Sequence, residues 1–425
     1  MRHRAKPGGG AATARGEGRS QRPARPRGRA PDPSMHRPSV QILLLLLTLF
    51  IMMVGFGIVI PTLPFLARRV NASPVQMGLL VTVWAAAQFL TAPLWGDVSD
   101  RVGRKPVLLA GVLGFGLTFF LMALARSYLA LLLARLAGGL LSSAALPTSQ
   151  AMVADLTEPE RRGAAMGAIG GVFSLGFMFG PAIGGALAPL GLAVPFVVAG
   201  ALGTIAAPVG FLLLREPPPR TPRVRQPLWR GVWAALRSPY SILFWLAFGA
   251  TFGGSAMFSM LGYYFIDRLA GSPTQVGLAF TLLGLAGVAL QFGLVGPLIR
   301  RWGEVAVTCA GLLVGAIGFA VTAASATATV VIACVVLIGI GLALVRPAIT
   351  SLLSKRAEQG LGLAMGVQSA FDSLGRTVGP LWAGMIYAVD IRAPFASSSA
   401  VFLLFFLATL GAARRVRPAP QTAGR

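Results

Sequence analysis

The stretch "SLGFMFGPAIGG" (residues 174–185) lies in a long apolar run, yet it carries one proline and four glycines, which weaken a helix. It returns 199 positions later as "SLGRTVGPLWAG" (residues 373–384), with the same G-x-x-x-G-P core. Two more pairs keep this offset: "SPVQMGL" (73–79) with "SPTQVGL" (272–278), and "GAAMG" (163–167) with "GLAMG" (362–366). Agreement at one offset predicts a duplicated set of helices in one orientation.

The composition is that of a membrane protein. Of 425 residues, 55% are hydrophobic and only 12% are charged, whereas about 25% of a soluble protein is charged. The only two cysteines lie in apolar runs, which does not suggest a disulfide framework. A helix needs roughly 20 apolar residues to cross the hydrocarbon layer. On that basis the chain contains twelve candidate spans: 40–66, 76–97, 106–125, 129–153, 164–188, 193–214, 240–263, 275–298, 304–324, 328–352, 361–386 and 394–412.

The net charge of +24 is distributed unevenly along the chain. Ten basic residues lie in the first 37 positions, which are rich in Gly and Pro and are expected to be disordered. This tail suits anionic lipid headgroups, and nucleic-acid binding is not expected. The two termini and the even-numbered loops carry 29 basic residues against five in the odd-numbered loops, so we expect both termini in the cytoplasm and the protein in the cell membrane.

The repeat and the loops predict the domain organisation. We expect an all-α membrane protein in which two parallel six-helix repeats surround a central cavity. The predicted parts are a disordered basic tail (1–37), a first six-helix half (38–214), a cytoplasmic linker (215–239), a second six-helix half (240–413) and a cytoplasmic tail (414–425).

The loop after the second span reads "GDVSDRVGRKPVLLAG" (96–111). It resembles the signature loop of the major facilitator superfamily, G-x-x-x-D-R-x-G-R-K. The matching residues are Gly96, Asp100, Arg101, Gly103, Arg104 and Lys105. In that family the loop is a latch between the two halves and favours the outward-facing state. The second-half counterpart "GPLIRRWGE" (296–304) lacks an acid equivalent to Asp100, so only the first copy is expected to act as a latch.

The fifth span is similar to the antiporter signature of the twelve-helix drug/proton antiporter branch, which includes multidrug and tetracycline-type exporters. The matching residues are Gly176, Gly180, Pro181, Gly184 and Gly185. Glycines four residues apart form a smooth face for close helix packing. The alternative is ordinary small-residue packing. Span 11 carries a partial twin in Gly375, Gly379, Pro380 and Gly384.

Charged residues inside spans are candidates for proton coupling, because a charge in hydrocarbon is costly. Arg135 in span 4 fits the family's L-x-x-x-R-x-x-x-G spacing, with a snorkelling arginine as the alternative. Asp372 and Arg376 in span 11 are four residues apart and can pair directly. Asp372 is therefore either the proton carrier or half of a permanent ion pair. Span 1 lacks the acid that many drug/proton antiporters carry there, so the coupling ion stays open.

Further polar, charged or aromatic residues inside spans are candidates for the substrate cavity, with interhelical packing as the alternative. They are Gln88, Gln150, Tyr263, Gln291, Arg346, Gln368 and Phe371. A cavity with positive charge would suit neutral, zwitterionic or anionic amphiphiles. No metal cluster, nucleophile elbow or phosphate loop occurs, so we expect neither an enzyme nor a cofactor or metal.

The resemblance implies a monomeric transporter that exports a small amphiphilic compound in exchange for protons by alternating access. One alternative is a proton symporter or facilitator for a small nutrient such as a sugar. A second alternative is a transport-inactive receptor or scaffold on the same fold.

Overall fold

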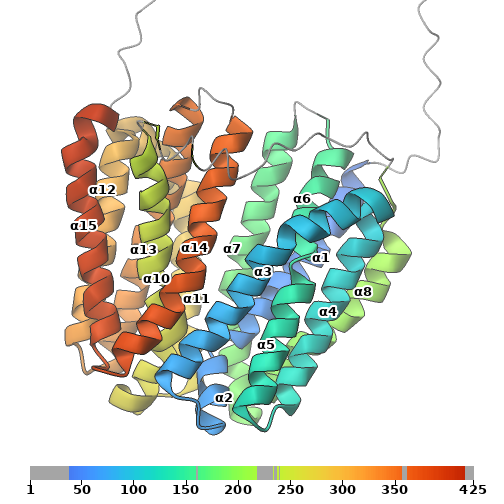
Figure 1. The fold of residues 1–425 in the computed structure, drawn as a ribbon, viewed down its shortest axis with the longest axis horizontal. Helices are drawn as coiled ribbons and strands as arrows, with labels where there is room; N and C mark the ends of the chain where they lie inside the picture. Colours follow the sequence, from blue (N-terminus) through green and yellow to red (C-terminus); the bar gives the residue numbers. More distant parts are fainter. Residues whose placement is uncertain are drawn as a thin grey trace, which may run out of the picture. The chain divides into compact units, whose positions relative to one another are not determined.

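The computed structural model describes residues 38–158, 161–217, 233, 237–238, 240–356 and 361–416. The predicted tail 1–37, most of the predicted linker 215–239 and most of the tail 414–425 lie outside the described residues. Within them the chain is helical and crosses a membrane repeatedly, as predicted. In Figure 1 helices α1–α8 group on one side and α10–α15 on the other.

The first six crossings correspond closely to the first six predicted spans. Helix α2 completes the first crossing, and α5 and α6 together make the fourth. The helices are α1 (Pro38–Val59), α2 (Leu63–Arg69), α3 (Pro74–Val102), α4 (Arg104–Leu124), α5 (Tyr128–Ser142), α6 (Ala145–Leu156), α7 (Arg162–Leu187), the short η2 (Ala188–Leu190) and α8 (Val194–Leu213).

The last six crossings follow the same pattern. The eighth crossing contains a π-helical turn, η3, and continues into α12, which also forms the ninth crossing. The helices are α10 (Ser241–Leu269), α11 (Pro273–Ala289), η3 (Leu290–Leu294), α12 (Val295–Ala324), α13 (Ala328–Arg356), α14 (Leu361–Tyr387) and α15 (Ala393–Val416).

By length and composition, ten stretches of the described residues could span a membrane. One of these, Pro273–Ala324, contains two predicted spans, which a left-handed Gly303 (φ 78°) separates. Helix α14 is not among the ten, because Gln368, Asp372 and Arg376 make it too polar. The twelve predicted crossings are therefore all present as helices, and the polarity of α14 marks it as unlike the others.

Short sequence signals set where the helices begin. Ser73 and Ser272 each cap a helix, and the glutamine three residues later bonds back to the serine N–H, which makes two matching capping boxes. Gly103, with φ 112°, lets the chain reverse between α3 and α4 without an intervening loop. The repeated "SP-x-Q" stretch thus starts an equivalent helix in each set of six.

Packing follows the repeat as well. Helix α7 packs between α1 and α11, and its counterpart α14 packs between α10 and α3. Helices α4 and α8 pair in the same way as α12 and α15. Large buried aromatics fill the core of the last six crossings, among them Tyr264, Phe319 and Phe402. The α7–α11 and α3–α14 pairs are the main contacts between the first six crossings and the last six.

Successive crossings alternate in direction, so their loops alternate between two ends. We call the end that holds the α3–α4, α6–α7 and α13–α14 junctions the basic end, because most Lys and Arg residues between crossings lie there. The other end holds α2, η2 and the α10–α11 and α14–α15 junctions, and we call it the opposite end.

Candidate functional site

The signature loop at the basic end is held by a set of acids. The Arg104 guanidinium lies 2.5 Å from the Asp100 carboxylate and 3.4 Å from the Asp155 carboxylate at the end of α6. It also donates to the Ser99 hydroxyl at 2.7 Å. Gly96 is buried and Arg101 is exposed. Asp100 therefore pairs with a cation of its own loop, and Asp155 ties the loop to the fourth crossing.

Glu216, just after α8, completes this loop. Its carboxylate accepts the backbone N–H groups of Arg104 and Lys105, the latter at 2.8 Å. A carboxylate at a helix N-terminus is favoured by the unpaired N–H groups and the helix dipole. The Lys105 ammonium lies over the Phe211 ring, 4.8 Å from its centroid. Sequence reasoning missed Asp155 and Glu216, although a chain with only 13 acidic residues makes each one informative.

The glycines of α7 form the smooth face that was expected. A methyl group added at Gly176, Gly180 or Gly184 would overlap atoms of α1, chiefly the backbone around Met53 to Ile58. Gly185 faces the other way and lies against Gly277 of α11. The signature segment of α7 therefore packs against α1 of its own set and also contacts α11 of the other set.

The two sets of six meet near the opposite end through two equivalent contacts. The space at Gly78 of α3 is filled by the Pro380 carbonyl of α14, and the space at Gly277 of α11 is filled by the Pro181 carbonyl of α7. Thr82 donates to the Thr377 carbonyl at 2.8 Å, and Thr274 donates to the Gly185 carbonyl at 2.9 Å. Backbone touches backbone at these points, which leaves no room for a passage.

An ionic clasp of Arg68, Asp267 and Tyr387 lies at the same end. Arg68 of α2 pairs with Asp267 of α10, and the Tyr387 hydroxyl of α14 donates to Asp267 at 3.0 Å. Tyr263 is fully buried beneath the Arg68 guanidinium and donates to the Ala72 carbonyl at 2.7 Å. The prediction that Tyr263 lines a cavity is therefore wrong for this conformation, because a ring used to join the two sets exposes no surface.

Towards the basic end the two sets move apart. A methyl group added at Gly163, Gly167 or Gly170 of α7 would meet no described atom within 4 Å. The same holds at Gly287 of α11 and Gly293 of η3. Gly171 of α7 still lies close to the Phe292 ring of η3. The interface is thus closed at the opposite end and open at the basic end.

The charged residues of α13 and α14 form the polar part of this interior. The Asp372 carboxylate accepts from the Arg346 guanidinium at 3.1 Å, and its side chain is only 8% exposed whereas that of Arg346 is 60% exposed. One turn away, the Gln368 amide donates to the Thr350 hydroxyl at 3.1 Å. The expected Asp372–Arg376 pair is not formed, because α13 brings Arg346 closer than a neighbour on the same helix. Arg376 is exposed.

Arg135 of α5 is buried and has found partners within its own set. Its Nε donates to the Leu80 carbonyl of α3 at 3.1 Å, and its guanidinium lies 5.3 Å from the centre of the Trp84 ring. The arginine therefore neither snorkels nor projects into open space in this conformation. The buried guanidinium sits between α5 and α3 instead.

The remaining candidates are scattered. Phe371 is buried against Phe244 and Trp245 of α10, at ring-centre distances of 5.8 and 5.2 Å. Gln150 and Gln291 are exposed, and Gln88 is partly exposed. The structure groups only Arg346, Gln368, Asp372 and Arg376 with one another.

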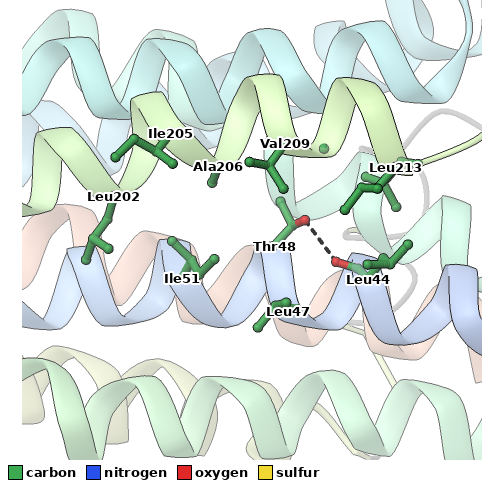
Figure 2. Close-up of a pocket in the computed structure, with 11 residues that line it drawn as sticks. Leu44, Leu47, Thr48, Ile51, Leu202, Ile205, Ala206, Val209 and Leu213 are labelled. Carbon is green, nitrogen blue, oxygen red and sulfur yellow. Dashed lines mark hydrogen bonds between the residues drawn. The ribbon is translucent and has the colours of Figure 1, made fainter.

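Figure 2 shows a groove between α1 and α8 that is lined by apolar side chains. Its Thr48 hydroxyl is already used, because it donates to the Leu44 carbonyl at 2.9 Å. None of the sequence-predicted site residues lines this groove. It suits apolar groups and offers no proton or ion chemistry.

Twelve membrane-crossing helices, packed as two equivalent sets that close at one end, define a membrane transporter. Residues 45–361 and 243–425 match the Major Facilitator Superfamily, and the chain belongs to that family. It is 29% identical to the quinolone resistance protein NorA of Staphylococcus aureus over 361 residues, which cover 83% of this chain and 92% of NorA. It is 30% identical to multidrug resistance protein 1 of Bacillus subtilis over 367 residues, which cover 85% and 93%.

Solved structures share the fold. The human organic anion transporter MFSD10 (TETRAN) aligns with a TM-score of 0.65 at 27% identity, over 88% of this chain and 99% of that one. A bacterial homologue of the human lysosomal transporter Spinster, in an inward-facing conformation, aligns with a TM-score of 0.72 at 17% identity, over 90% and 99%. The chain is therefore a multi-pass membrane transporter and not an enzyme.

Proposed function

We propose that this transporter exports a small amphiphilic compound from the cytoplasm in exchange for protons. The observation that carries the proposal is the interface between the two sets of six. Backbone contacts close it at the opposite end, while glycines of α7 and η3 border open space at the basic end. Rocking of the two sets about this interface would open the chamber to alternate sides. The names of the bacterial relatives, which are quinolone and multidrug resistance proteins, support export.

The basic end is assigned to the cytoplasm in this proposal. The loops and termini assigned to that side carry 29 Lys and Arg residues against five on the other side. Both termini are then cytoplasmic, and the conformation described above is open inwards. The signature loop, with Arg104 held by Asp100 and Asp155, lies on the cytoplasmic side, where it would lock the sets together when the chamber opens outwards.

Asp372 is the proposed proton carrier. It is a carboxylate within a span, it lies in the interior, and its bond to Arg346 can be exchanged for a proton. When Asp372 is protonated, Arg346 loses its partner and the contact between α13 and α14 weakens. That coupling of charge to helix packing is what a proton-driven cycle requires.

The test uses everted membrane vesicles from cells that express the full chain. Addition of a transported compound should release protons from energised vesicles, and a pH gradient should drive its uptake. Asp372→Asn should abolish both responses, while Asp390→Asn, an exposed acid in the α14–α15 junction, should leave them intact. Full gradient-driven transport by Asp372→Asn would remove Asp372 as the carrier. Proton movement in the same direction as the compound would favour the symporter alternative.

A further inference from the structure

Helices α7 and α14 hold equivalent positions but present different chemistry. At the offset of 199, Met166 corresponds to Met365, Phe173 to Asp372 and Phe177 to Arg376. These positions are seven and four residues apart, so they share one face of each helix. The face is apolar and aromatic on α7, and it carries both signs of charge on α14.

This face of α14 is turned away from lipid. The exposed apolar side chains of α14, Leu374, Val378 and Met385, mark its lipid side. At about 100° per residue, Arg376 lies roughly 160–180° around the helix from them. Exposed Ser369 falls beside Arg376 on the same side. On one flank of this side Asp372 contacts α13, and on the other flank the Thr377 carbonyl contacts α3. Arg376 therefore faces the space between the two sets.

The three charges in this region do not cancel. Asp372 and Arg346 form one ion pair, and Arg376 adds a second guanidinium one turn along α14. Arg376 has no hydrogen-bond or ion-pair partner among the residues that the structure describes. Because Arg376 is exposed to this space, its N–H groups are free to bind a carboxylate through two parallel, charge-assisted hydrogen bonds. The cluster of Arg346, Asp372 and Arg376 thus has a net charge of +1, which one anionic group would neutralise.

The facing helices supply aromatic surface. Phe177 of α7 contacts Phe56 of α1 and Phe258 of α10, with ring centres 6.0 and 6.3 Å apart, and Phe56 stacks on Trp84 at 5.1 Å. All four rings are partly exposed. A flat aromatic group would bury apolar area here and gain from edge or stacked contacts.

We infer that the compound carried by this transporter is an aromatic carboxylate, which binds with its anionic group at Arg376 and Arg346 and its ring system against Phe56 and Phe177. This inference rests on the proposed transport function and adds the class of substrate to it. Asp372 then competes with the substrate for Arg346, because both are carboxylates that reach the same guanidinium. Removal of the Asp372 charge would leave two arginines for one anion and tighten its binding.

Binding to the purified full chain in lipid nanodiscs tests this without any transport step. The probes are pyrenebutyrate, pyrenebutanol and pyrenebutylamine, which share one ring system and differ in head-group charge. The wild-type chain should bind pyrenebutyrate about tenfold more tightly than pyrenebutanol, and pyrenebutylamine least. Equal affinities, or tighter binding of the amine, would overturn the inference, and this comparison needs no variant.

Two variants assign the effect to the cluster. Arg376→Gln should weaken pyrenebutyrate binding about tenfold, the range expected for one charged hydrogen-bonded contact, and leave pyrenebutanol unchanged. Arg301→Gln, an exposed arginine at the basic end, is the matched control and should change nothing. Asp372→Asn should tighten pyrenebutyrate several-fold and weaken pyrenebutylamine. Pyrenebutanol binding reports whether the aromatic part of the site is intact, and circular dichroism of each variant reports folding.

The outcomes separate this inference from the proposed function. Loss of all three probes in Arg376→Gln, with a folded chain, would make Arg376 a structural residue and overturn the inference. Unchanged pyrenebutyrate binding in Arg376→Gln would overturn it as well. If the vesicle assay shows no proton exchange while the order of probe affinities holds, proton exchange fails and the anion site stands.

Discussion

The charged junctions of the two sets of six form an instructive pair. In the first set, Arg104 at the start of α4 pairs with Asp155 at the end of α6. In the last set, Glu304 of α12 pairs with Lys355 of α13 and also accepts from Ser351 at 2.9 Å. Both pairs join the start of one crossing to the end of the next, and their signs are reversed. An ion pair therefore occurs at this junction in both sets, with the charges exchanged between the helices.

The sign of the charges around the signature loop differs between the two sets. The first set adds Asp100 beside Arg104 and Glu216 over the start of α4, so its loop is fixed by three acids. The equivalent turn in the last set also contains a glycine with positive φ, Gly303 (φ 78°), but the acid beside it, Glu304, pairs with Lys355. The difference agrees with the expectation that only the first copy can act as a latch, and it shows how one duplicated backbone can be specialised in one half.

The interior charges make the largest expected difference between the sets, since the equivalent positions in α7 are phenylalanines. Arg346→Gln leaves the buried Asp372 without its partner and should lower the free energy of unfolding by about 3 kcal/mol. Chemical denaturation in detergent measures this change in the free energy of unfolding. The double variant Arg346→Gln/Asp372→Asn should regain most of that loss. A double variant no more stable than the single one would contradict the pairing.

Substitutions on the glycine faces of α7 and α14 should give the second-largest effect on stability. Gly184→Ala should cost about 2 kcal/mol, because its methyl group would overlap the Ile58 carbonyl oxygen of α1. The equivalent position in α14 is already the buried Ala383, so Ala383→Gly should cost only about 1 kcal/mol, through lost helix propensity. Thermal unfolding of the two variants side by side measures the difference. Equal melting temperatures for Gly184→Ala and wild type would show that α7 and α1 can separate freely.

A variant of the ionic clasp tests how the interface is held closed at the opposite end. Asp267→Asn removes the charge that holds Arg68 and should shift the population towards opening of the opposite end by up to about fivefold. Labelling of a cysteine placed at Thr82, in a chain without Cys309 and Cys334, reports that opening. Asp390→Asn serves as the control acid. Labelling that stays at the control rate would mean that the backbone contacts alone close this end.

The capping boxes should give the smallest difference. Ser73→Ala and Ser272→Ala each remove a side chain that accepts from the N–H of the glutamine three residues later, at 3.2 and 3.4 Å. Each should cost about 1 kcal/mol, and the two values should agree closely. Thermal unfolding measures both. A large inequality would show that the repeat "SP-x-Q" is retained for different reasons in the two sets.

Much of the fold could be predicted from the sequence because its signals are local. Apolar length identified the crossings, and three repeated stretches gave the equivalence of the two sets. Span 361–386, the later α14, was also predicted by length, and its glycines repeat those of α7.

The site was only partly predictable, because its contacts join residues far apart in the chain. Spacing suggested Arg376 as the partner of Asp372, and the packing of α13 on α14 supplied Arg346 instead. Tyr263 looked like a cavity residue and is a buried link to Ala72. Asp155 and Glu216 gave no local pattern, and only the approach of α6 and α8 to the signature loop reveals them.

The sequence by itself determined a membrane protein of twelve crossings, built from a duplicated set, with tightly packing glycines in α7. These depend on apolar length and on backbone freedom, which belong to single segments. The tertiary structure alone decided which charges pair, which rings are buried and which end of the interface is closed. Those outcomes depend on distances between helices, and such distances are set only when all the helices pack together.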